Sequence, residues 1–127
     1  MSATAELSAF VADLDLSRVP DDVVHQAKRC LIDWLGVTLH GATDPGVQIL
    51  LDMIDEVGAA DGQATVLGRG RRVSLPFAAL INGFASHVDD YDDTYNPAAT
   101  TVHGSAPVWP VVLALAERTP TSGASAL

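Results

Sequence analysis

Residues 77–88 form an apolar run whose helical pattern leaves almost no polar face. A helix of that kind must be covered by other elements on several sides, so we expect it at the centre of the fold. Ser74 can cap its first turn, and Pro76 fits there because the first turn has no use for the missing N–H. Small side chains within the helix would let neighbouring helices approach closely; they are Ala78, Ala79, Gly83, Ala85 and Ser86.

Apolar residues at helical spacing predict four more helices around this central one. Proline or acidic residues near their starts and glycine near their ends support several of these boundaries. Short β-type runs around glycines, between residues 64 and 73, predict a small hairpin. The predicted fold class is therefore all-α: mostly helical, about five helices with one small β-hairpin. The four further helices are expected over residues 3–14, 20–39, 44–58 and 111–118.

The composition is apolar for a chain of 127 residues, which is long enough for one small domain with a core. Hydrophobic residues make up 48% and charged residues only 18%. A small protein has much surface to cover with polar groups. We therefore expect part of the surface to be buried against another subunit, or against a further part of the same polypeptide.

Charge and cysteine usage exclude several classes of partner and site. The net charge of −9 argues against nucleic acid and acidic membranes as partners. The lone cysteine, Cys30, excludes a disulfide scaffold and is expected to be a buried, reduced thiol. The N-terminus lacks the pattern of a signal peptide, and no apolar run has the length of a membrane helix. A cytoplasmic protein is the simplest expectation.

The chain concentrates its proton-exchanging groups in residues 87–107. Four aspartates (Asp89, Asp90, Asp92 and Asp93) fall within five positions, and two histidines, His87 and His103, bracket them. Apolar helical patterns lie on both sides of this segment. A polar loop held by rigid elements is the usual setting of a binding or catalytic site.

The aspartates permit a metal-site interpretation. Asp89, Asp90 and Asp93 satisfy the pattern DDxxD, which in all-α prenyl-diphosphate enzymes binds magnesium ions and a diphosphate. The pattern is weak by itself, because such a site also needs a second metal motif and a basic lining. The chain has only seven lysines and arginines in total.

Metal-free acid–base chemistry is a second interpretation of the same loop. His103 could exchange a proton near neutral pH, with a nearby carboxylate to orient its ring. Thr94 could donate a hydrogen bond to a substrate carboxylate, and the backbone N–H groups of Gly104 and Ser105 could bind an anion. A third interpretation is structural: the loop is an interaction surface whose aspartates cap helices. The residues alone leave all three open.

Several segments occur in an order and spacing that match a known family. Around the loop they are Asn82-Gly83, His87, Asp90 to Thr94, His103 to Ser105 and Ala114 to Glu117; upstream they are Ala27 to Gly36 and Thr65 to Gly68. Together they resemble the MmgE/PrpD family, from about residue 5 to residue 118. The family includes 2-methylcitrate dehydratase, cis-aconitate decarboxylase and iminodisuccinate epimerase.

This resemblance implies a function and a set of site residues. Family members act on small di- and tricarboxylates with no metal and no organic cofactor, and are usually homodimers with a large helical domain and a smaller lid domain. Asp90, Thr94 and His103 match the family's active-site Asp, Thr and His. Residues 1–127 would then be the N-terminal part of the helical domain, with the remaining catalytic groups further downstream.

The functional expectation follows from that resemblance. The chain is expected to be the N-terminal segment of a cofactor-independent lyase, for example one that dehydrates 2-methylcitrate-like acids, and to be inactive by itself. Its partners would be a small carboxylate substrate and either a second copy or the missing C-terminal part of the same protein. The alternative is a non-catalytic helical fragment or interaction module.

Overall fold

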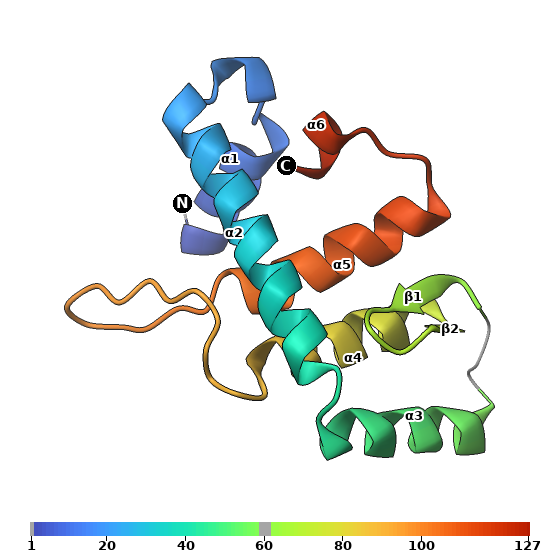
Figure 1. Cartoon of the computed structure of the whole chain (residues 1–127). Helices are drawn as coiled ribbons and strands as arrows, with labels where there is room; N and C mark the ends of the chain where they lie inside the picture. The colour runs from blue at the N-terminus through green and yellow to red at the C-terminus, as the bar shows by residue number, and fades with distance from the viewer. Residues whose placement is uncertain (1, 59–61) are drawn as a thin grey trace.

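The computed structural model describes residues 2–58 and 62–127, and these residues are mostly helical (Figure 1). The helices are α1 (Ala3–Ala12), α2 (Asp21–Gly41), α3 (Pro45–Val57), α4 (Leu75–His87), α5 (Ser105–Arg118) and α6 (Gly123–Ala126), with a 3-10 turn, η1, at Leu16–Arg18. Strands β1 (Ala64–Val66) and β2 (Arg71–Val73) pair antiparallel as a hairpin. The predicted fold class, mostly helical with one small hairpin, is confirmed.

Helix α4 lies at the centre, as its sequence predicts. It contacts α2, α3, α5 and both strands, and Figure 1 shows these elements around it. Its Ala78 and Ile81 have no exposed surface. The core around them is built mainly from α3 and the hairpin, through Val47, Leu51, Ile54, Val66 and Val73. Helix α4 is therefore held in place by packing on several sides.

Hydrogen bonds from two polar side chains attach the hairpin to the helices. Asn82 of α4 is buried; its side-chain carbonyl accepts from the Leu67 N–H (3.0 Å), and its amide donates to the Thr65 carbonyl (2.9 Å). Glu117 of α5 accepts from the Thr65 N–H (2.8 Å) and from Arg72 (2.6 Å). The short strands gain from the helices the support that an isolated hairpin lacks.

Helix α5 begins earlier than its sequence predicts. The expected start at residue 111, after two prolines, is wrong: the helix begins at Ser105 and includes Pro107 and Pro110. Pro107 lies in the first turn, where the helix needs no N–H. Pro110 is buried against α4 at Gly83, where an added Cβ would lie 3.6 Å from the proline ring. Packing against α4 thus offsets the loss of the backbone hydrogen bond that Pro110 cannot make.

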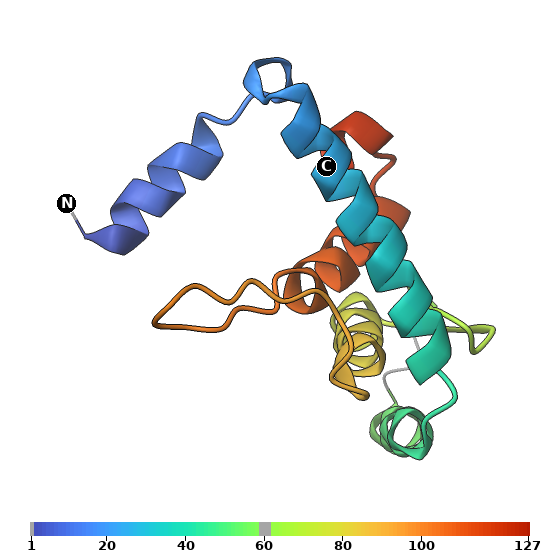
Figure 2. The same cartoon turned by 60° about the vertical axis from the view of Figure 1, so that its left-hand side comes forward.

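Helix α1 forms as expected, but it ends at Ala12 and buries none of its residues. Its apolar stripe, which includes Leu7, Phe10 and Val11, stays exposed, and Figure 2 shows α1 directed away from the other helices. The apolar surplus of the composition is therefore visible as exposed side chains. No described helix combines the length and the hydropathy that a membrane crossing requires.

The close approach of α2 to α4 generates a stability prediction. A Cβ added at Gly41 would lie 2.0 Å from the Ala85 carbonyl oxygen, whereas one added at Gly36 meets nothing within 4 Å. Gly41→Ala should lower the free energy of unfolding by about 1–3 kcal/mol, because the helices must separate. Gly36→Ala should raise it by about 0.5–1 kcal/mol, since alanine favours a helix interior. Urea unfolding followed by circular dichroism compares the two; equal effects would contradict this packing.

Candidate active-site loop

The loop between α4 and α5 begins with a reversal of the chain at Asp90. This residue has a left-handed backbone (φ 50°), and its N–H donates to the His87 carbonyl at 2.9 Å. Aspartate tolerates this conformation better than most residues, although it remains less favourable than for glycine. The reversal brings the next residues back towards the end of α4, so that Asp92 lies beside His87.

A single β-bridge further along the loop places Thr94 beside His103. Tyr95 and Val102 exchange two backbone hydrogen bonds of 2.8 Å each. In an antiparallel pairing, the residue before Tyr95 and the residue after Val102 lie opposite each other. The Thr94 hydroxyl oxygen is accordingly 3.4 Å from Nδ1 of His103. Two residues that the sequence singles out, nine positions apart, are thus brought together by the loop's own backbone.

The carboxylate of Asp92 connects two imidazoles. Its side chain has no exposed surface; Oδ1 lies 2.7 Å from Nδ1 of His87, and Oδ2 lies 3.2 Å from Nδ1 of His103. The two rings meet edge to face, with centroids 4.6 Å apart. A buried charge is costly unless it is paired, and here both oxygens have partners. The loop is therefore organised around Asp92.

Asp90 belongs to the same cluster, although its side chain is exposed. One possible metal-ligand atom from each of His87, Asp90, Asp92 and His103 lies within 4.8 Å of the others. The structure thus brings all three predicted site residues, Asp90, Thr94 and His103, into one region. The carboxylate that bonds the His103 ring is that of Asp92, however, and not that of Asp90, which the resemblance matches to the family's active-site Asp. Sequence reasoning did not select Asp92, because nothing in the sequence distinguishes it from three neighbouring aspartates.

The DDxxD aspartates do not converge on one point. The carboxylate of Asp89 pairs with Nε2 of His40 at 3.4 Å, and Asp93 accepts from the backbone N–H of Ser105 at 3.3 Å. Asp93 therefore caps the start of α5, as the structural interpretation of the aspartates expects. The Ser105 N–H, predicted to bind a substrate anion, is used inside the protein instead.

Among the residues that the structure describes, one group could hold a metal ion: His87, Asp90, Asp92 and His103. The Nδ1 atoms of both rings face Asp92 at hydrogen-bond distance. In this arrangement one carboxylate orients two imidazoles through hydrogen bonds.

Three hollows border the loop. An apolar groove of about 580 Å³ between α4 and α5 has His87 and His103 along it, together with Leu80 and Phe84. A second hollow, of about 620 Å³ between α2 and the loop, is lined by Arg29, Asp92 and Asp93 among others. Both hollows therefore have residues of the cluster in their lining.

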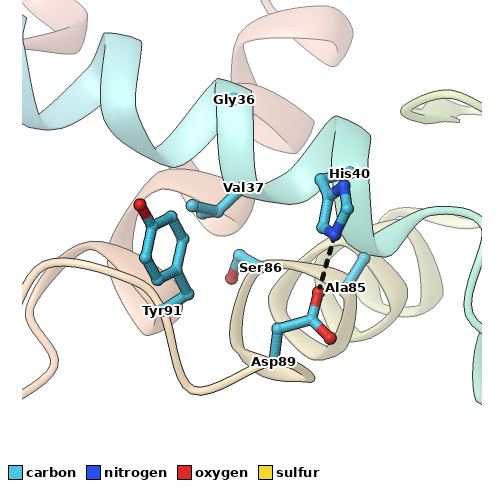
Figure 3. Close-up of a pocket in the computed structure, with 7 residues that line it drawn as sticks. All are labelled: Gly36, Val37, His40, Ala85, Ser86, Asp89 and Tyr91. Atoms are coloured by element: carbon cyan, nitrogen blue, oxygen red, sulfur yellow. Dashed lines mark ion pairs between the residues drawn. The ribbon is translucent and has the colours of Figure 1, made fainter.

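A third pocket, of about 400 Å³, lies between α2 and the C-terminal end of α4 (Figure 3). His40 and Tyr91 stand at its two ends, with Val37 and Ser86 between them. None of the three predicted site residues lines it. Cys30 lies earlier in α2 than the residues of this pocket. Its side chain is half-buried, so the expectation of a buried thiol is met only in part.

Comparison with known proteins identifies the family. The model of the MmgE/PrpD N-terminal domain matches residues 5–127. The chain belongs to the MmgE/PrpD family. The resemblance seen in the scattered motifs is thereby confirmed over nearly the whole chain.

Curated relatives carry the names of cis-aconitate decarboxylases. The mouse protein is 32% identical over 120 residues, which are 94% of this chain and 24% of the relative. The human protein is 33% identical over 122 residues, 95% of this chain and 24% of the relative. A cis-aconitate decarboxylase-like protein of Aspergillus oryzae is 31% identical over 116 residues. The chain spans about a quarter of the length of these MmgE/PrpD relatives.

Asp92 also changes the pKa of His87, the imidazole that lies nearer to its carboxylate. The hydrogen bond that His87 donates to Asp92 raises the pKa of His87 above its usual value; partial burial opposes the shift, and the negative charges of Asp92 and Asp90 add to it. Folding therefore stabilises the protonated form of the His87 ring. The ion pair contributes to stability only while His87 carries its second proton.

This pairing generates a pH prediction. Because the folded pKa is raised, the contribution is fully present below the unfolded pKa of about 6.5 and is lost as pH rises through the folded value. His87→Gln should therefore lose more unfolding free energy relative to wild type at pH 5.5 than at pH 8.5. Urea unfolding at both pH values measures the difference. The matched control is His25→Gln on the exposed face of α2; an equal pH dependence in both variants would contradict the assignment.

Proposed function

We propose that this chain supplies the N-terminal part of the active site of a cofactor-independent lyase that acts on small di- and tricarboxylates. The observation that carries the proposal is the cluster in which Thr94 and Asp92 both contact the His103 ring. Membership of the MmgE/PrpD family supports it, as do relatives named as cis-aconitate decarboxylases.

The proposed chemistry needs a group that accepts a proton and returns it. His103 would be the general acid/base, because an imidazole exchanges protons near neutral pH. In dehydration it would remove a proton from the carbon next to a carboxylate and return that proton to the hydroxyl group on the neighbouring carbon, whose C–O bond breaks so that water leaves. In decarboxylation, carbon dioxide leaves with its bond electrons remaining on carbon, and the imidazolium protonates that carbon. Asp90 would be a second acid/base. Thr94 would anchor a substrate carboxylate once its hydroxyl releases the hydrogen bond that it donates to the Asp92 backbone carbonyl at 3.2 Å.

An anionic substrate also needs cations, and this chain offers few near the cluster. Arg29 is the basic side chain among the residues that line the hollow on the α2 side of Asp92. We propose that further basic groups come from the portion corresponding to the remaining three quarters of the relatives, or from a second copy. Exposed apolar side chains such as Phe10 and Ile32 are consistent with such a covering partner.

The competing proposal is a non-catalytic helical module that binds another protein. It rests on the exposed apolar stripe of α1, which nothing in the described structure covers. Far-UV circular dichroism with thermal melting shows whether the chain is a stable module by itself. A turnover assay with cis-aconitate and 2-methylcitrate then separates an enzyme component from an interaction module.

The catalytic proposal is tested on the complete product of the reading frame that contains these residues. His103→Ala should lower kcat/KM for the preferred tricarboxylate by about 10²-fold or more, because the proton acceptor is lost. The exposed His25→Ala is the matched control and should keep the wild-type rate. A nearly unchanged rate in His103→Ala would remove this residue from the mechanism.

A further inference from the structure

We infer that Asp92 is a positioning residue, which holds the imidazoles of His87 and His103 in the same tautomer, with Nδ1 protonated and Nε2 available to exchange a proton. The importance of this arrangement for turnover rests on the proposed function. The arrangement itself follows from the hydrogen bonds of the loop and can be tested without any substrate.

The first argument is the inventory of donors and acceptors around Asp92. An ionised carboxylate only accepts hydrogen bonds. Nδ1 of His87 lies 2.7 Å from one oxygen and Nδ1 of His103 lies 3.2 Å from the other, so each Nδ1 must carry a proton. A neutral imidazole has one N–H, which leaves Nε2 of both rings with a free lone pair.

Thr94 provides an independent argument for His103. Its hydroxyl donates to the Asp92 backbone carbonyl at 3.2 Å. The hydroxyl has one proton, so its oxygen can only accept from Nδ1 of His103, 3.4 Å away. The hydrogen bonds to the side chain and to the backbone carbonyl of Asp92 therefore indicate the same tautomer of His103. The side chain of Asp92 has no exposed surface, so bulk water is not positioned to replace either bond.

The consequence is that two imidazoles in the same tautomer lie along one groove. Both rings line the apolar groove between α4 and α5, and their side chains are 48% and 29% exposed. Asp90, which also belongs to the cluster, adds a second negative charge near the rings. A reaction that removes a proton and delivers another can use two such groups, since His87 could accept or supply the proton that His103 does not.

The test is a nitrogen-15 NMR measurement on the 127-residue chain with labelled histidines. Long-range proton–nitrogen spectra at high pH, where the rings are neutral, distinguish a protonated from an unprotonated ring nitrogen. We expect His87 and His103 both to show protonated Nδ1 and bare Nε2. A bare Nδ1 on either ring would overturn the inference, whatever the activity of the protein.

The variant Asp92→Asn sharpens the test, because an amide has one acceptor oxygen and one donor nitrogen. It can keep only one ring in the original tautomer, so the other ring should change to protonated Nε2, and the titration midpoint of His87 should fall. The control is Asp93→Asn, whose carboxylate contacts the Ser105 N–H and not the rings; it should leave both tautomers unchanged.

Unchanged tautomers in Asp92→Asn would overturn the inference. If that variant does not fold, the wild-type spectrum still decides. Two protonated Nδ1 atoms in a protein without turnover would count against the proposed lyase only.

Discussion

The buried carboxylate of Asp92 is the constraint on which the candidate active-site loop depends. An ionised group without solvent contact must be paired, and its two partners come from elements far apart in the loop. His87 is the last residue of α4, and His103 lies two residues before α5 begins. The left-handed turn at Asp90 and the bridge between Tyr95 and Val102 are the backbone features that let the chain reach both.

The geometry of the loop is in turn set by the packing of the helices that hold it. The end of α2 at Gly41 touches the backbone of α4 at Ala85, and α5 crosses α4 closely at Gly83. These contacts fix the positions of His87 and of the start of α5. A shift of either helix would lengthen a hydrogen bond to a carboxylate that has no exposed surface, so core packing and the geometry of the loop are coupled here.

Much of the fold could be predicted from local sequence signals, and the misses have physical causes. The apolar run of α4 predicted a central helix, and Gly58 ends α3 in the left-handed conformation that favours glycine. The start of α5 could not be predicted, because local rules exclude Pro110 from a helix interior and do not include its packing on Gly83. The stripe of α1 shows which face is apolar, but it contains no information about a partner.

The four aspartates at positions 89–93 show the same limit of prediction from sequence. Four aspartates look equivalent in sequence, yet three have different partners: Asp89 pairs with His40, Asp92 with two imidazoles, and Asp93 with the start of α5. Each of these three carboxylates thus has its own hydrogen-bonding or charged partner, which offsets the mutual repulsion expected of neighbouring aspartates. Asp90 is the member with a left-handed backbone, which costs a non-glycine residue about 1 kcal/mol or more. Glycine would avoid that cost at this position, but it would also remove the carboxylate that lies beside the two rings.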